Sequence, residues 1–555
     1  MQPISRRLFL VSTVAVLVAS CSDDQSTVGT APLPSPTDAK TPDSGSTVAP
    51  VATTVAEAAS TTTSDPGPQF DASPFTLGVA SGDPGVGSVV LWTRLALDPL
   101  AGGGMPADDF DVRWEMALDP EFTEIGYDGI ETARPGHGHS VHVNATVDAG
   151  TWYYRFHAGG HTSPIGTTRT APSTDAEPEL LRFASASCQH YEHGFYTAQR
   201  DLADKQPDFA IWLGDYIYEG NQAAGIDGVN VRSHGTDEIV SIDDYRNRYA
   251  LYKTDPDLQA AHAACPWYVI WDDHEVENNY AGLTPQDAAD QAAFAQRRRD
   301  AYQAWWEHQP VALPPPGDDP QAEYRIYRAA RWGSLLNLTL LDGRQYRSDQ
   351  ACGDPGLSLE PACPETFDEA RTMLGDEQEA WLFDELTSST ATWNVIGQQT
   401  VFGDLTLAGA VLNYDQWDGY PVNRNRILDR LAIEQEDAHA DNVVVLTGDI
   451  HLAGTGTLRS GMPGTGTPVG VEFVATSISS GGLVDPVVTD IVKAFPDILD
   501  AELEHRGYIL HTVTPTTWLA EYRMVETVKE RDAPMFVHDT YRIDVGTNTV
   551  GFAQA

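Results

Sequence analysis

Residues 71–172 alternate short apolar and polar stretches in the manner of β-strands. Runs such as GSVVLWTRL, VRWEMAL, HSVHVNATV and WYYRFHA are rich in β-branched and aromatic residues, and Gly or Pro separates them. Many short strands with frequent turns are typical of a sandwich, and about 100 residues is the size of an immunoglobulin-like module. The pattern predicts a β-sandwich N-terminal domain over residues 70–172.

The pattern changes after Pro172. Apolar runs of strand length now alternate with helix-like stretches, such as the Ala-rich residues 289–309, which Pro310 ends. This alternation predicts an α/β domain over residues 173–555. Five apolar runs lead into groups of polar residues: Cys188 and Gln189; Asp215, Tyr218 and Glu219; Asp272, Asp273, His274, Glu277, Asn278 and Asn279; Asp342, Arg344 and Tyr346; Asp449 and His451. Because sites in α/β sheets gather at strand ends, the five groups together predict one metal-binding crevice.

The side chains at these strand ends differ in the ions they prefer. Carboxylates, amide oxygens and His suit divalent metals, whereas a thiolate and a phenolate favour a trivalent or transition ion. Asp215 and Tyr218 lie three residues apart just after a strand, so a turn brings both to one ion. Asp449 and His451 lie two apart, so on an extended segment both point to one side. An Asp shared by two ions holds them about 3.5 to 4 Å apart, which suits a phosphoryl group.

The N-terminus has the features of an export signal. Arg6 and Arg7 precede the apolar run VSTVAVLVAS, which is too short to span a bilayer. Residues 1–21 resemble a twin-arginine signal that ends in a bacterial lipobox, with Cys21 lipidated; the alternatives are an ordinary cleaved signal and an uncleaved anchor. Residues 22–69 are Ser, Thr, Pro, Ala and Asp with hardly a large apolar residue, which predicts a disordered linker. We expect anchoring to the outer leaflet of the membrane through Cys21, or secretion.

The charge of the chain restricts its partners. The 555 residues include 80 Asp plus Glu against 34 Lys plus Arg, a formal net charge of −46, so nucleic acids and anionic membrane surfaces would be repelled. The 21% charged and 41% hydrophobic residues exclude disordered, collagen-like and multi-spanning membrane proteins. We expect a monomer that binds no nucleic acid specifically.

Several motifs resemble one enzyme family. LGDYIYE, WDDHEVENN, LDGRQYRSDQ, QWDGY and TGDIH, in this order, resemble the alkaline phosphatase D (PhoD-like) family of metallophosphoesterases. FTLGVASGDPGVGSVVLWTRL and EFVATSISSGG resemble the same family, so the resemblance covers nearly all of the chain after the linker. It implies a four-layer αββα catalytic domain with two packed mixed sheets over residues 173–555, preceded by the immunoglobulin-like β-sandwich. It also implies one Fe³⁺ and one or two Ca²⁺.

The resemblance assigns ligands motif by motif. Iron would be bound by Cys188, Asp215, Tyr218 and His451, with Asp215 bridging to calcium, and calcium by Asn278, Asp418 and Asp449 as well. Asp415 competes with Asp418, since it lies one short turn away. By analogy with purple acid phosphatases, Asp273, His274 and Glu275 would be ligand, proton donor and orienting carboxylate. The Asp273 and Asn278 assignments compete as the metal ligand.

The implied reaction is hydrolysis of phosphate esters. Fe³⁺ would lower the pKa of bound water, Ca²⁺ would neutralise phosphate oxygens, and hydroxide would attack in line while His274 protonates the leaving group. One Arg among residues 297–299, with Arg297 as first choice, would grip the phosphate, or this basic helix face pairs with acidic surface residues. Asp342 and Arg344 are expected to form a supporting pair.

The sequence is compatible with several physiological substrates. The first reading is an exported alkaline phosphatase and phosphodiesterase for phosphate acquisition. The alternatives are a phospholipase D or wall-polymer phosphodiesterase, and a cell-surface binding protein without turnover. Export also predicts a disulfide between Cys352 and Cys363, whereas Cys265 is expected to be a buried, inert thiol.

Overall fold

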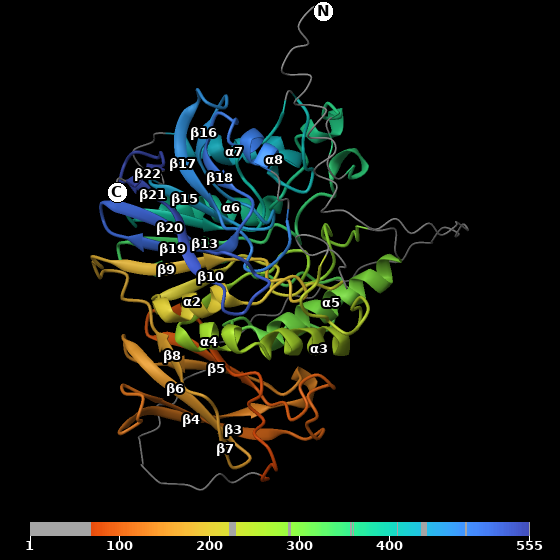
Figure 1. Ribbon diagram of the computed structural model, residues 1–555, viewed down its shortest axis with the longest axis vertical. Helices are drawn as coiled ribbons and strands as arrows, with labels where there is room; N and C mark the ends of the chain where they lie inside the picture. The colour runs from red at the N-terminus through yellow and green to blue at the C-terminus, as the bar shows by residue number, and fades with distance from the viewer. Residues whose placement is uncertain are drawn as a thin grey trace, which may run out of the picture.

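A computed structural model of the chain describes residues 68–220, 229–286, 290–355, 358, 360–407, 409–433, 441–482 and 486–553 (Figure 1). The predicted export signal, Cys21 and all but the last two residues of the predicted linker lie outside these ranges. Among the described residues, no helix is both long and apolar enough to cross a membrane.

The largest sheet has ten strands in the order β22-β21-β20-β19-β9-β10-β11-β1-β2-β5. Its strands are β1 (Val79–Gly85), β2 (Ser88–Arg94), β5 (Ser140–Thr146), β9 (Leu181–Ala186), β10 (Phe209–Trp212), β11 (Pro266–Val269), β19 (Arg506–Val513), β20 (Thr517–Val525), β21 (Met535–Asp544) and β22 (Gly551–Phe552). β9, β10 and β11 pair in parallel, so their carboxyl ends meet at one edge of the sheet.

The predicted strands before Pro172 are present, but they do not form a closed pair of sheets. β3 (Phe110–Ala117), β4 (Ile125–Ala133), β6 (Thr151–Ala158), β7 (His161–Thr162) and β8 (Gly166–Arg169) form a separate five-stranded sheet. This sheet shares a hydrophobic core with β1, β2 and β5, and it lies at one end of the molecule (Figure 1). β1, however, pairs in parallel with β11, with Ser81 opposite Pro266. The pairing satisfies a sheet edge that would otherwise be open.

A second large sheet has seven strands in the order β12-β13-β14-β15-β17-β16-β18. Its strands are β12 (Arg328–Trp332), β13 (Leu336–Leu340), β14 (Trp393–Gly397), β15 (Val443–Thr447), β16 (Ala453–Ser460), β17 (Thr467–Val474) and β18 (Ile498–Glu502). β13, β14, β15 and β17 are parallel neighbours, and β12, β16 and β18 add antiparallel pairs.

The two large sheets contribute to one hydrophobic core. It contains Ile211 of β10 and Val444 of β15, while Val445 belongs to a second core, because successive residues of a strand face opposite sides. The second core joins the outer face of the seven-stranded sheet to helices α6 and α7 through Leu382 and Ile427. This confirms the predicted α/β class with packed mixed sheets.

The described residues form both α-helices and short 3₁₀ helices. The α-helices are α2 (Thr197–Lys205), α3 (Ile242–Lys253), α4 (Pro256–Ala264), α5 (Gln291–His308), α6 (Gly375–Ser388), α7 (Pro421–Leu431) and α8 (Pro486–Val492). Short 3₁₀ helices are η1 (Pro135–His137), η2 (Ala351–Gly353), η3 (Pro364–Phe367) and η4 (Trp417–Gly419). α5 confirms the predicted Ala-rich helix, which begins after the N-cap Asp290 and ends before Pro310. In the view of Figure 1, helices α3, α4 and α5 lie between the five-stranded sheet and strands β9 and β10 of the ten-stranded sheet.

The predicted disulfide between Cys352 and Cys363 is present, and Cys265 is a free, buried thiol as expected. The bond closes a loop with a sequence separation of 11 residues. The bond lowers the conformational entropy of the unfolded chain. Because the double substitution to Ser removes this restriction, we expect it to lower the free energy of unfolding by about 2 to 3 kcal/mol. Thermal unfolding of the oxidised wild type and the variant measures this. Equal stability of the two proteins would contradict the expectation.

Candidate metal centre

The predicted polar groups lie at the carboxyl ends of parallel strands. Cys188 follows β9, Asp215 follows β10, and the Asp272–His274 segment follows β11 in the ten-stranded sheet. From the seven-stranded sheet, Asp449 and His451 follow β15. A bridge between Ser187 and Ser477 ties the two sheets together next to Cys188. The groups that were predicted to meet in one crevice therefore come from both sheets.

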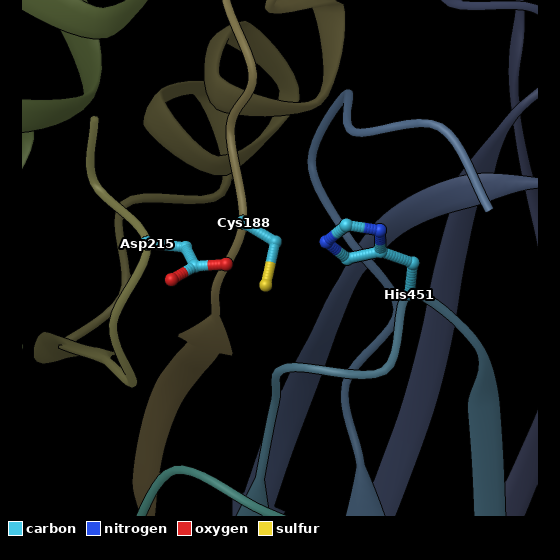
Figure 2. A group of neighbouring side chains, drawn as sticks. All are labelled: Cys188, Asp215 and His451. Atoms are coloured by element: carbon cyan, nitrogen blue, oxygen red, sulfur yellow. The ribbon is translucent and has the colours of Figure 1, made fainter. Parts of the chain in front are cut away.

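Two triplets of possible metal ligands share one carboxylate. Ligand atoms of Cys188, Asp215 and His451 lie within 4.8 Å of one another. In Figure 2, Cys188 and Asp215 extend from neighbouring segments, and His451 faces them from a loop on the opposite side. Ligand atoms of Asp215, Asp273 and His274 also lie within 4.8 Å of one another and form a second triplet. Asp215 is thus the carboxylate that the two triplets have in common.

A third triplet consists of Asp272, Asp273 and Asp449. Asp449 and His451 were expected to point to one side of an extended segment, but they belong to different triplets. The backbone explains the difference, because φ is 68° at Asp449 and 54° at His451, which is the left-handed region. Cys188 and Asp215 also have positive φ, at 59° and 57°. Such residues cost of order 1 to 3 kcal/mol each and cluster at functional sites.

Tyr218 adds a fourth possible ligand next to the triplet of Cys188, Asp215 and His451. Its hydroxyl donates to Asp215 Oδ2 at 2.8 Å and lies 2.9 Å from His451 Nε2. This confirms that the turn after β10 brings Asp215 and Tyr218 together. Ser480 Oγ donates to the same phenol oxygen at 2.8 Å.

The acidic groups of the centre are buried close to one another without enough cationic partners. Burial, and then the neighbouring carboxylate of Asp215, raise the pKa of Cys188 and of Tyr218 well above their usual values. Burial also raises the pKa of Asp215 and Asp449. Within the described part of the chain, Asp215 Oδ1 and Asp272 Oδ2 are buried and accept no hydrogen bond. A bound cation would compensate both features, so this donor set fits metal ions.

His274 is held by a carboxylate that differs from the expected one. Its Nδ1 lies 2.6 Å from Glu219 Oε2, and its ring centroid lies 4.2 Å from that of Tyr218. Burial alone would lower the pKa of His274, but the charges of Glu219 and Asp215 outweigh it and raise this pKa well above its usual value. Conversely, the His274 charge overcomes the effect of burial and lowers the pKa of Glu219 to about 2.

Glu275 was predicted to orient His274, and the structure corrects this. Its carboxylate accepts backbone N–H groups of Asp215 at 3.0 Å, Tyr216 at 2.6 Å and Asp272 at 2.8 Å. Because these residues follow β10 and β11, Glu275 fixes the loops that carry the ligands instead.

One guanidinium, that of Arg344, connects several carboxylates. Arg344 is fully buried and contacts Asp272, both oxygens of Asp415 at 2.9 Å, and Asp449 at 3.2 Å. Asp415 is also bound by Arg347 at 2.5 Å and by Gln350 at 2.8 Å. Arg344 therefore supplies positive charge next to the third triplet.

This arrangement can be compared with known proteins. The PhoD-like phosphatase family matches residues 183–522, and its N-terminal domain family, "PhoD-like phosphatase, N-terminal domain", matches residues 58–172. Alkaline phosphatase D of Bacillus subtilis (strain 168) is 46% identical over 479 residues, which are 84% of this chain and 80% of the relative. The chain belongs to the PhoD-like phosphatase family. A solved structure of PhoD superposes with a TM-score of 0.83 at 43% identity and covers 88% of this chain and 94% of its own.

Two of the calcium ligands expected for this PhoD-like phosphatase have side-chain partners other than the triplet residues. Asp418 is buried, forms an ion pair with Arg424 and accepts the Leu405 N–H at 3.0 Å. Asn278 donates from its side chain to Gln286 Oε1 at 2.6 Å. Of the competing assignments, Asp273 is the residue that the structure brings to Asp215 and Asp449.

The remaining predicted partners of the phosphatase site also have other contacts. Arg297 forms ion pairs with Glu277 at 2.6 Å and Glu238 at 2.7 Å. This geometry matches the alternative that the basic helix face pairs with acidic residues. The Asp342 carboxylate accepts the backbone N–H of Arg344 at 2.9 Å, while the Arg344 guanidinium turns to other carboxylates. Asp342 and Arg344 are therefore joined through the backbone of Arg344 and not through its guanidinium.

Sequence reasoning missed Glu219 as the partner of His274 and Ser480 as the partner of Tyr218. Glu219 lies directly after Tyr218 in the GDYIYE motif, so its position at the strand end was a usable signal. Ser480 lies in a motif far along the chain, and local sequence does not reveal that it meets Tyr218.

Proposed function

We propose that this phosphatase hydrolyses phosphate esters with one Fe³⁺ at Cys188, Asp215, Tyr218 and His451, and with Ca²⁺ next to it. The observation that carries the proposal is Asp215, which belongs to two triplets of ligand atoms within 4.8 Å. A thiolate, a phenolate and an imidazole favour a transition or trivalent ion, and the carboxylates Asp273 and Asp449 suit calcium. We retain Asn278 and Asp418 as further calcium ligands, which would require their side chains to exchange their present partners.

When bound, the ions would supply an activated water and positive charge for the phosphate oxygens. The chain itself supplies the ligand geometry and a proton donor. Glu219 holds His274 in one orientation, and the charges of Glu219 and Asp215 raise the pKa of its imidazole. His274 would then protonate the leaving oxygen of the ester.

A role of His274 as proton donor predicts a dependence on the leaving group. We expect His274→Ala to lower kcat for an alkyl phosphate by about 10²- to 10⁴-fold, because an alkoxide leaves poorly without a proton. The loss for p-nitrophenyl phosphate should be much smaller, since its leaving group is stabilised by the ring. Parallel assays of the two substrates measure this. Equal losses would rule out proton donation, and His262→Ala, a buried imidazole that contacts Tyr216, is the matched control.

The substrate class is tested by kcat/KM for a phosphomonoester and a phosphodiester side by side, with calcium present and with a chelator. A preference for the monoester supports phosphate acquisition. A strong preference for the diester favours degradation of lipid headgroups or wall polymers. No turnover of either substrate by the metal-loaded protein would overturn the enzymatic proposal and leave a binding protein.

Location, assembly and the finer architecture complete the proposal. The paired arginines and Cys21 support twin-arginine export and anchoring to the outer leaflet. The proposal also takes the chain to act as a monomer. The two packed sheets with outer helices support the four-layer αββα core of the family. The strands before Pro172 support the immunoglobulin-like N-terminal domain. Mass spectrometry of the exported protein would test for lipid on Cys21.

A further inference from the structure

The motif EFVATSISSGG has no role in the proposed reaction, although it lies beside the candidate metal centre. Its first residues belong to β17, and the segment continues past the end of the strand to Ser480 and Gly481. Ser480 is fully buried. Arg506 Nε donates to the Ser480 carbonyl at 2.7 Å, which fixes the backbone at this point.

The Ser480 hydroxyl has one direction in which to donate. Its oxygen accepts the backbone N–H of His190 at 3.0 Å, and a backbone amide is always the donor in such a pair. Its own proton is directed at the Tyr218 phenol oxygen, 2.8 Å away. Ser480 therefore fixes the position of the Tyr218 oxygen through a directed hydrogen bond.

The next residue, Gly481, acts on a second ligand. The Gly481 carbonyl contacts His451 Nδ1, and a carbonyl only accepts, so Nδ1 carries the proton. The lone pair of His451 is then on Nε2, the nitrogen that faces Tyr218. Gly481 N–H in turn donates to His193 Nδ1 at 2.9 Å, which holds the peptide in place.

We propose that Ser480 is a positioning residue of the metal centre, which fixes the direction of the Tyr218 oxygen toward the ion, while Gly481 fixes the tautomer of His451. This inference rests on the proposed function only in taking Tyr218 and His451 as ligands of one ion. Partners of this kind orient metal ligands in many proteins, and their loss typically costs about 10- to 100-fold in metal affinity or activity.

The test measures metal retention in the absence of substrate. The full chain is loaded with its metal, exposed to increasing chelator, and the transition metal left per chain is determined by elemental analysis. We expect Ser480→Ala to lose its ion at about tenfold lower chelator concentration than the wild type. The control is Ser479→Ala, because Ser479 is equally buried but donates to the His190 carbonyl at 3.0 Å instead of to a ligand.

A double-mutant cycle locates the effect at Tyr218. In a Tyr218→Phe background, Ser480→Ala should bring no further loss, since the acceptor oxygen is absent. For an iron-loaded protein, Ser480→Ala should also move the tyrosinate absorption band to longer wavelength. The inference is overturned if Ser480→Ala retains metal like Ser479→Ala, if its effect persists without the Tyr218 hydroxyl, or if the wild type retains no transition metal.

The outcomes separate this inference from the proposed function. A wild type that hydrolyses esters, together with a Ser480→Ala variant that holds its metal normally, would remove the positioning role alone. A Ser480→Ala variant that loses metal, in a protein that turns over no phosphate ester, would remove the proposed function alone.

Discussion

Asp215→Asn is expected to lower kcat/KM for a phosphomonoester on the order of a thousandfold, because metal ions contribute several kcal/mol to such reactions and this residue would hold two of them. Asp215 is the carboxylate shared by the triplets with Cys188 and His451 and with Asp273 and His274. An amide offers one neutral oxygen where the carboxylate offers two charged ones. Both ions should therefore bind more weakly, which elemental analysis after gel filtration would measure.

The matched control for Asp215 is Asp201→Asn. Asp201 is a partly buried carboxylate that binds Tyr508 at 2.8 Å and Arg523 at 2.6 Å, apart from the triplets. Its substitution should leave metal content and kcat/KM nearly unchanged. If Asp215→Asn kept a full complement of two ions, Asp215 would not bridge them, and the two triplets would have to be read as separate sites.

The second large effect concerns stability. We expect Arg344→Met to lower the free energy of unfolding of the metal-free protein by about 3 to 5 kcal/mol, the usual cost of leaving buried charges without their partner. The guanidinium compensates Asp272, Asp415 and Asp449, and none of these carboxylates is exposed. Calorimetry in chelator would show the loss as a lower Tm.

Calcium should reduce this loss, because a divalent cation bound by Asp272 and Asp449 replaces part of the missing positive charge. The control is Arg542→Met, which breaks an exposed pair with Asp544 and should leave the Tm nearly unchanged. An Arg344→Met protein that unfolds at the wild-type Tm in chelator would show that the carboxylates are not ionised together.

The sequence predicted the elements of this site better than their geometry. The polar groups at the strand ends correctly predicted that Cys188, Asp215, Asp273 and His451 lie close together, because parallel strands place their carboxyl ends at one edge. The direction of each side chain depended on backbone conformations that local pattern does not reveal. Asp449 and His451 adopt positive φ, so the alternation rule for extended chains did not apply to them.

Partners from distant segments were the least predictable. Glu275, next to His274, was the natural candidate to orient it, yet its carboxylate satisfies three backbone amides and Glu219 takes the role. Arg344 was expected to pair with Asp342, two residues away, but it contacts acids from three other loops. Such choices are decided by which buried charges need compensation, and this is a property of the assembled fold.

The parallel pairing of β1 with β11 has a consequence for protein engineering. The loop after β11 carries Asp272, Asp273 and His274, and β11 is an inner strand of its sheet because β1 covers one side. Shortening the chain at Pro172 would therefore cut through a continuous sheet and leave the edge of β11 open to solvent. Chimeras between relatives should exchange the two segments together, since neither carries a complete set of hydrogen-bonded strands by itself.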